Sequence, residues 1–451
     1  TAAAESTADV EMVTSYAHAL AGAGQLDEVR ELAEEYRRRG ASEAAVAGLL
    51  LTSYNAAGRH GEALELWNAY PELQAASNAS WLRAAAASAL ASGGMELATE
   101  LLDRGIGLPT VSRQLRCEFL SVKALTAFHR GDYNVALTTI AEAAHDLQEL
   151  GSLRALSTVR LNQAAFFKQL GRYAEMNDAL EECLSLRRSG SEGRSYAFAQ
   201  AALAELRIDQ GRFEEADDLL IEALETLELY GPSRFLINTI AMTSSLHLAK
   251  GDYVTAVSFG ERALLLAREA GAPRLVREIL FDAASANARL GNAAAAQAQA
   301  DEMAALGAAA GASPADDCRT QWVTGLTLEA QGARQAAAEA LAGALAAAKQ
   351  GGQELEANKI AIDLGRVTKN PRVATEALAW FDEHGLGLGR ILVARAFPRS
   401  GAAPVVVGHV TEAERRLEVL GEMRLGPPGA PQGVKGEQRR RLLALLLLAR
   451  V

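Results

Sequence analysis

Glycine recurs at a nearly constant interval through this chain of 451 residues. In the central part, glycines that open short turns, such as Gly131-Asp-Tyr and Gly251-Asp-Tyr, lie 40 or 41 residues apart. Nearer the N-terminus the interval is 34, 35 and then 38 residues. A period in this range is typical of repeat proteins, in which each unit packs only on its neighbours. The glycines that mark the period are Gly24, Gly58, Gly93, Gly131, Gly171, Gly211, Gly251, Gly291 and Gly332.

A second glycine follows the first by 20 residues in four of these units. The residue after a helix often adopts a left-handed backbone conformation, which glycine allows without steric cost. Pro232, Pro273 and Pro314 stand just beyond three of these positions, where they prevent a helix from continuing. Each unit is therefore predicted to be a pair of helices. The second glycines are Gly151, Gly231, Gly271 and Gly311.

Small residues recur where two paired helices must touch. They stand seven residues before and five residues after the marking glycine. Small side chains at both places allow the helix axes to approach to about 8 Å, the short end of the usual spacing. The positions before the glycine are Ala124, Ala164, Ala204, Ser244, Ala284 and Gly325, and those after it are Ala136, Met176, Ala216, Ala256, Ala296 and Ala337.

The composition agrees with an all-helical chain. Hydrophobic residues make up 49% of it but aromatic residues only 5%, and alanine and leucine supply most of the remainder. Such a composition favours closely packed helices over sheets, which prefer aromatic and β-branched residues. Cys117, Cys183 and Cys318 are far apart and show no zinc-ligand spacing, so we expect small buried side chains in a reducing compartment.

Patterns that carry catalysis are missing from the sequence. It has no GxxxxGK[ST] phosphate loop, no HExxH and no GxSxG, and its seven histidines show no metal-ligand spacing. We therefore expect a protein that is not an enzyme and that uses neither a cofactor nor a metal. The longest apolar run, Leu442–Ala449, is too short to span a bilayer, and no charged and apolar leader opens the chain, so we expect a cytoplasmic location.

The repeat resembles the tetratricopeptide family. The resemblance lies in the small residue of the first helix, the Gly-Asp-Tyr-like turn and the alanine five residues later, and it covers about residues 10–385. The leading tryptophan and trailing proline of that family are mostly absent, and the unit is stretched to 40 residues. The longer unit is similar to the arms of bacterial signal-transduction ATPases and of the maltose-regulon activator. The resemblance implies an all-α, right-handed superhelical solenoid of about ten hairpins over residues 1–388.

In that family the first helix of each pair lines a concave face. The resemblance therefore implies a groove that binds a protein, a peptide or a small effector. An ordinary solvated or half-buried helix residue would fit each position as well, and no position singles out a ligand. The candidate groove residues are Glu118, Phe128, Lys168, Phe198, Glu205, Asn238, Phe281, Arg319 and Trp322.

The sequence changes in character after residue 388. Residues 389–411, with the apolar runs 391–393 and 404–410 and prolines at 398 and 404, are predicted to be a non-helical linker. The stretch 416–425 alternates as a strand does. Residues 435–450 are predicted to form a helix whose run of leucines has no polar face, so we expect the domain to continue past Val451. Residues 391–451 hold ten Lys and Arg against five Asp and Glu, although the whole chain has a net charge of −11.

The segment 412–451 resembles the start of the winged-helix domain of bacterial transcriptional activators. The similarity rests on Leu417-Glu-Val-Leu-Gly421 and on the basic residues before the leucine run. The leading strand is two residues shorter than that family's, and the recognition helix and wing that read DNA are not in this sequence. The α+β segment would thus be a partial winged helix. Its candidate phosphate contacts, which might equally be the solvated start of a helix, are Arg439, Arg440 and Arg441.

Three functions fit these observations. The first is a bacterial transcriptional regulator whose repeats bind an effector and whose C-terminal domain binds DNA. The second is a tetratricopeptide scaffold that mediates protein–protein interactions. The third is the arm of a signal-transduction ATPase whose nucleotide domain precedes Thr1. None of them calls for a membrane partner.

Overall fold

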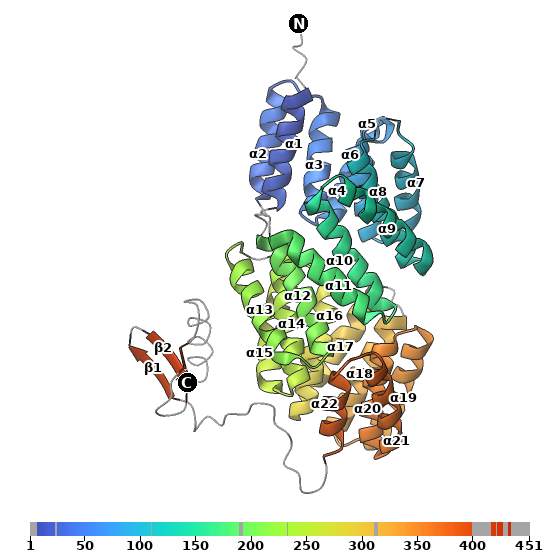
Figure 1. The fold of residues 1–451 in the computed structure, drawn as a ribbon, viewed down its shortest axis with the longest axis vertical. Coiled ribbons are helices and arrows are strands. Elements are labelled where there is room, and N and C mark those ends of the chain that lie inside the picture. The colour runs from blue at the N-terminus through green and yellow to red at the C-terminus, as the bar shows by residue number, and fades with distance from the viewer. Residues whose placement is uncertain are drawn as a thin grey trace. The chain divides into compact units, whose positions relative to one another are not determined.

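The computed structural model describes residues 7–22, 25–109, 111–188, 193–231, 233–310, 314–398, 416–420, 422–426 and 432–433. The chain divides into two compact units (Figure 1). One comprises Thr1–Leu170 with Ala174–Ser191, and the other comprises Gly171–Tyr173 with Glu192–Val451. Where a single array was predicted over residues 1–388, the hairpins thus fall into two groups.

The first unit holds five helical hairpins and one short extra helix, α5, which lies between the second and third hairpins. Helix α11 begins with Tyr173, at the boundary between the units. The helices are α1 (Thr7–Gly22), α2 (Leu26–Arg38), α3 (Glu43–Ala56), α4 (His60–Ala69), α5 (Pro71–Ala75), α6 (Ala79–Ala91), α7 (Met95–Ile106), α8 (Arg113–His129), α9 (Tyr133–Glu149), α10 (Leu153–Gln169) and α11 (Tyr173–Arg188).

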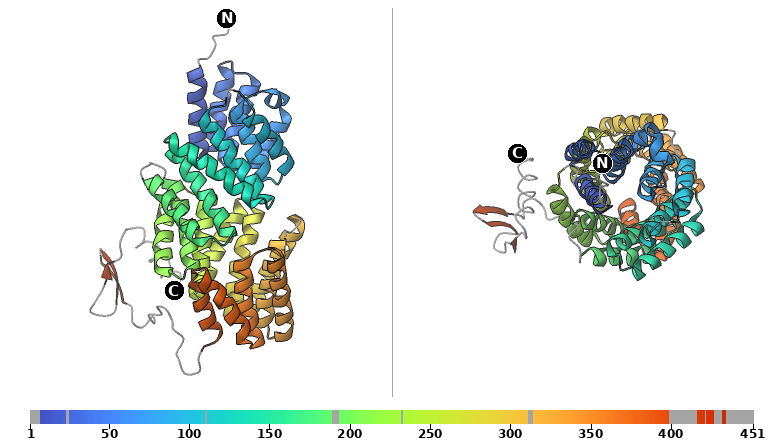
Figure 2. Two further views of the ribbon diagram at one scale, coloured as in Figure 1. Left: turned by 45° about the vertical axis from the view of Figure 1, so that its right-hand side comes forward. Right: turned by 90° about the horizontal axis from the view of Figure 1, so that it is seen from above.

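The second unit holds five more hairpins and a final single helix. Figure 2 shows these helices side by side from two further directions. They are α12 (Gly193–Asp209), α13 (Phe213–Glu228), α14 (Arg234–Lys250), α15 (Tyr253–Glu269), α16 (Pro273–Leu290), α17 (Ala293–Ala310), α18 (Pro314–Ala330), α19 (Arg334–Gln350), α20 (Glu354–Thr368), α21 (Pro371–Glu383) and α22 (Leu388–Ala396). The described helices therefore make ten pairs, and no strand occurs in the described part of residues 110–350.

The marking glycines end the helices as the sequence predicted. Gly131, Gly171, Gly211, Gly251, Gly291 and Gly332 all have φ between 68° and 85°. The halfway glycines Gly151, Gly231 and Gly271 share this left-handed conformation. The turn after α20 shows what the position requires, because Lys369 adopts a φ of 57° there and is the only non-glycine residue with positive φ among the described residues. Left-handed turns thus set the repeat length.

The predicted small residues lie in the seams between paired helices. Ala124, Ala204 and Ala284 are completely buried, as are Ala216 and Ala256 on the partner helices. The clearest case is Gly325, because a Cβ atom there would lie 2.7 Å from Leu341 Cγ of the paired helix α19. Close approach through small side chains, with leucines filling the remaining space, is what stabilises each hairpin. Cys117, Cys183 and Cys318 are buried and form no disulfide.

Helix α22 lies in the range predicted to be a linker. The β-branched residues of 391–393 suggested extended chain, but Leu388–Ala396 is helical. Leu388 is buried in an apolar cluster with residues of α12, α13 and α14, among them Ala204, Phe213 and Leu246. Burial against distant helices therefore overrides the local preference for extended structure.

Three short strands are described after α22. They are β1 (Arg416–Leu420), β2 (Glu422–Gly426) and β3 (Gln432–Gly433). β1 pairs with β2, and β2 with β3, both antiparallel. The stretch predicted as a single strand over 416–425 is thus two paired strands. The helix predicted over residues 435–450 lies outside the described residues. Among the described helices, none is long and apolar enough to cross a bilayer.

Candidate site on the first helices of the second unit

The first helices of the second unit present matching positions to one common face. Counting 13 residues back from each helix-ending residue gives one side chain per helix from α12, α14, α16, α18 and α20. Three of the five had been predicted as groove residues. We call the face that carries this row the inner face of the second unit. The row consists of Phe198, Asn238, Glu278, Arg319 and Glu356.

Contacts between neighbouring first helices hold this row in place. Arg319 Nη2 donates a hydrogen bond to Glu356 Oε1 at 3.2 Å, and its guanidinium lies 5.7 Å from the centre of the Phe281 ring. Phe198 packs on Phe235 with ring centres 4.8 Å apart. Asn238 is half-buried. The row thus offers aromatic surface, an amide and charged groups.

Ionisable side chains from α12, α16, α18 and α20 lie close together beside the row, and two of them belong to it. We call Glu205, Asp209, Asp282, Arg319, Glu356 and Lys359 the central cluster. Lys359 Nζ of α20 lies 2.9 Å from Asp209 Oδ1 of α12, although 150 residues separate them. The side chain of Asp209 is only 7% exposed, so this pair is shielded from water. Helix α12, which begins the first hairpin of the unit, therefore meets α20, which begins the last hairpin.

The ionisation of Asp282 reflects this convergence. Burial raises its pKa, opposed by a hydrogen bond from Ser245 and by the charges of Arg319 and Lys359, while Glu205 raises it further. Burial also raises the pKa of Tyr173, with contributions from Asp209, Glu356 and Glu205. The cluster holds four carboxyl groups against two cations. Burial favours the neutral form of Asp282, so the other three carboxylates exceed the two cations by one, and the cluster favours a positively charged group brought in from outside.

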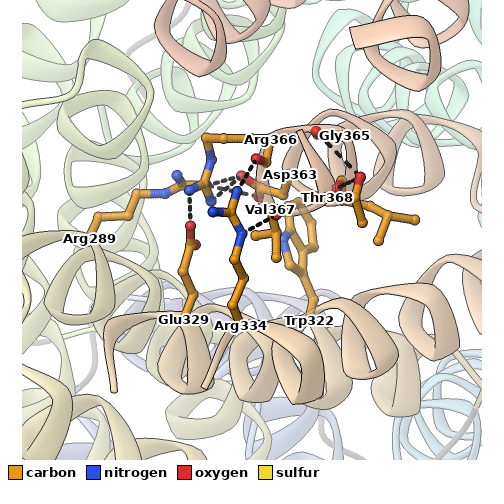
Figure 3. Close-up of polar contacts among 10 residues, drawn as sticks. Arg289, Trp322, Glu329, Arg334, Asp363, Gly365, Arg366, Val367 and Thr368 are labelled. Atoms are coloured by element: carbon orange, nitrogen blue, oxygen red, sulfur yellow. Dashed lines mark hydrogen bonds and ion pairs between the residues drawn. The ribbon is translucent and has the colours of Figure 1, made fainter. Parts of the chain in front are cut away.

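A second buried network lies at the ends of α16, α18 and α20 (Figure 3). The carboxylate of Asp363 accepts hydrogen bonds from Arg289 at 2.8 and 2.9 Å, from Trp322 Nε1 at 2.9 Å and from Arg366 at 3.1 Å. Arg366 also pairs with Glu329. Burial disfavours the charge on Asp363, but Arg289 and Arg366 outweigh it and lower the pKa of that carboxyl. Two cations and two anions balance, so this network serves packing between repeats.

The C-terminal end of α20 is hydrogen-bonded to α19 next to this network. Arg334 Nε, at the start of α19, donates a hydrogen bond to the carbonyl oxygen of Val367 at 2.5 Å. A cation at a helix C-terminus satisfies carbonyl groups that have no partner within the helix. Trp322, a predicted groove residue, is 7% exposed and belongs to this network.

The remaining predicted groove residues lie in the first unit. Glu118 pairs with Arg83 of the preceding first helix at 3.0 Å. Phe128 stacks on Phe166 with ring centres 4.4 Å apart, and Lys168 is half-buried. The structure does not bring these three into the central cluster. Arg439, Arg440 and Arg441 lie outside the described residues.

Sequence reasoning missed Asp209, Asp282, Glu356 and Lys359. Glu356 was within reach, because it occupies the same row as Arg319 once Lys369 is recognised as the helix-ending residue in place of glycine. Asp209 and Lys359 were not, because a repeat pattern relates neighbours and says nothing about contacts 150 residues apart. No group of three or more metal-ligating side chains is present in the described part of the chain.

Comparison with known proteins adds evidence on the fold. No family model matches the chain, and no curated protein matches it. Among solved structures, a Rap protein complexed with competence and sporulation factor has a TM-score of 0.56 at 12% identity, over 86% of this chain and 99% of that one. The Rap conjugation gene regulator of the plasmid pLS20, in complex with the Phr* peptide, has a TM-score of 0.52 at 13% identity, over 78% and 97%. The fold is thus a tandem array of tetratricopeptide-like helical hairpins.

Proposed function

We propose that this chain is a regulatory binding protein, not an enzyme, and that the inner face of its second unit binds a peptide. The central cluster would hold a positively charged group of that peptide, and the row above it would hold neighbouring residues. This assignment makes the repeats the effector-binding part of a regulator.

The observation that carries the proposal is the composition of the inner face. Phe281 and Phe198 offer apolar surface, the Asn238 amide can bond to a peptide backbone, and the cluster has two more carboxyl groups than cations. Binding sites for small ligands usually combine aromatic surface with a few polar groups. On an ordinary solvated helix face, an aspartate side chain would be largely exposed. The Asp209 side chain is instead 7% exposed and pairs with Lys359.

The comparisons support the same class of ligand. Both solved structures described above were determined as complexes, one with competence and sporulation factor and one with the Phr* peptide. They share this fold over most of their length. Two proteins of this fold are therefore seen with such a partner, which makes a peptide the first ligand to test here.

The test uses three fluorescein-labelled hexapeptides that differ only at their central residue, which is Arg, Gln or Glu. We expect the Arg peptide to bind the full chain most tightly and the Glu peptide least. Glu205→Gln should weaken binding of the Arg peptide by about tenfold, the effect of losing one charge-assisted contact. Glu376→Gln, on the exposed pair with Arg372, is the matched control. Equal affinities for the Arg and Glu peptides, or no binding by any of the three, would contradict the proposal.

We further propose that the C-terminal segment belongs to a DNA-binding domain. Two observations favour it: the antiparallel pair β1–β2, and the ten basic against five acidic residues of 391–451. The test is binding of a longer form, extended beyond Val451, to duplex DNA at several salt concentrations. Phosphate contacts require the affinity to fall steeply between about 50 and 200 mM salt. Absence of DNA binding would favour a plain scaffold for protein assembly.

A further inference from the structure

The second unit closes on itself through contacts between its two ends. Helix α20 meets α12 through Lys359 and Asp209. The rings of Trp380 and His384, at the end of α21, lie edge-on to Tyr173 with centres 6.5 and 6.1 Å apart. Helix α22 packs on the ends of α12 and α14. We call this set of contacts the closing seam.

Helix α22 is joined to those ends at two points. At its start, the backbone of Gly387 and Leu388 passes so close to α12 that a Cβ atom on Gly211 would lie 3.2–3.3 Å from it. At its far end, Arg395 Nη2 donates a hydrogen bond to the carbonyl oxygen of Ala249, the next-to-last residue of α14, at 2.7 Å. Arg395 thereby satisfies a carbonyl that has no partner within its helix.

The closing seam differs in kind from the seams between repeats. Paired repeat helices meet through completely buried alanines and leucines, such as Ala204, Ala216 and Leu220. Along α22 only Leu388 and Gly389 are buried, and Ile391, Leu392 and Arg395 are half-exposed. A helix of nine residues is not stable by itself in water, so α22 depends on its packing against α21, where Gly389 lies against Phe381, and on its docking on α12 and α14. Helix α22 therefore contributes only one buried apolar side chain, Leu388, to the closing seam.

We propose that α22 is a releasable strap that keeps the second unit closed as a ring. Its release, together with parting of Asp209 and Lys359, separates α12 from α20 and opens the inner face between them. Release of α22 would open the ring whether or not the inner face binds a peptide.

Hydrogen–deuterium exchange on the full chain tests the strap. Arg395→Ala removes one hydrogen bond and no buried side chain, and Leu388→Ser removes the buried anchor. In both variants we expect exchange to rise about tenfold or more in α22 and in the last turns of α12 and α14. Exchange in α16 and α18, which contribute no residue to the apolar cluster around Leu388, should stay unchanged. Lys359→Met should raise exchange in the same last turn of α12.

The matched control is Arg390→Ala. Arg390 lies on the same helix, but its side chain is 72% exposed and pairs only with Asp382 of α21. Its loss should leave exchange in α12 and α14 as in the wild type. Two outcomes would overturn the proposal. One is unchanged exchange in α12 and α14 in the Arg395→Ala and Leu388→Ser variants; the other is an equal rise in α16 and α18, which would make α22 part of one cooperative core.

Discussion

Lys359 and Asp209 form an ion pair 2.9 Å long between the last and the first of the five first-helices of the second unit. The Asp209 side chain is 7% exposed and that of Lys359 24% exposed. A charge this well shielded is costly to leave without its partner. The pair is therefore both a member of the central cluster and part of what joins the two ends of the unit.

Replacing Lys359 by Met should destabilise the fold by about 3 kcal/mol, because it leaves the buried Asp209 carboxylate without its cation. The Asp209→Asn/Lys359→Met double variant should recover about 1–3 kcal/mol relative to the sum of the single changes. Urea unfolding of the wild type and the three variants gives the coupling. Strictly additive effects would show that the two residues do not interact.

Asp363→Asn should destabilise the second unit by about 3 kcal/mol at neutral pH, since Arg289 and Arg366 would lose their shared counter-charge. The pKa of Asp363 is lowered in the fold, so its contribution is complete above about pH 4 and is lost as pH falls through the folded value. Thermal unfolding at pH 7 measures the loss. Arg372→Ala, which breaks a pair exposed by 86% and 69%, is the control and should have no measurable effect.

Asp282→Asn should have the opposite sign of pH dependence. Burial raises the pKa of Asp282, so the folded protein prefers its protonated form. Wild-type stability is therefore favoured below about pH 4 and declines as pH rises through the folded pKa, whereas asparagine does not titrate. The stability of the variant relative to the wild type should increase from pH 4 to pH 7 in thermal melts. A variant whose stability relative to the wild type stays constant or falls from pH 4 to pH 7 would place Asp282 outside a buried environment.

Gly211→Ala should cost more stability than Gly291→Ala. Both glycines have positive φ, 72° and 83°, so each substitution carries a left-handed backbone strain of about 1 kcal/mol. Around Gly291 the space is empty within 4 Å, but a Cβ atom on Gly211 would meet the backbone of Gly387 and Leu388. The extra cost at Gly211, about 1 kcal/mol or more, is that of displacing α22. Equal urea midpoints for the two variants would mean that α22 is not held against α12.

The repeats themselves were predictable because each one is a local structure. Gly131 and Gly251 have the left-handed conformation that their spacing implied, and Ala204 and Ala284 are buried as their register required. These features depend on residues within one hairpin or its neighbour. A single sequence with a nearly constant period therefore carries the information that specifies each hairpin.

The closing seam could not be read from the sequence in the same way. Ile391 falls in the predicted linker, but the structure places it in a helix, half-buried against the apolar cluster that α12, α13 and α14 form with Leu388. Likewise, Trp322 is a predicted groove residue, but it is buried and donates a hydrogen bond to Asp363, 41 residues later in the chain. Contacts of this kind are set by how far the array curves, and curvature accumulates over many repeats without leaving a mark on any one of them.

Closure also has a consequence for how such a protein can evolve. An open array tolerates the duplication or deletion of one unit, since the new neighbours meet through the same surfaces as the old ones. In the second unit, gaining or losing a single 40-residue hairpin between α13 and α20 would carry Lys359 and Arg395 away from Asp209 and Ala249. Selection should therefore remove variants that gain or lose a hairpin in this region. Homologous chains should keep the same number of hairpins here even where their lengths differ in the other unit.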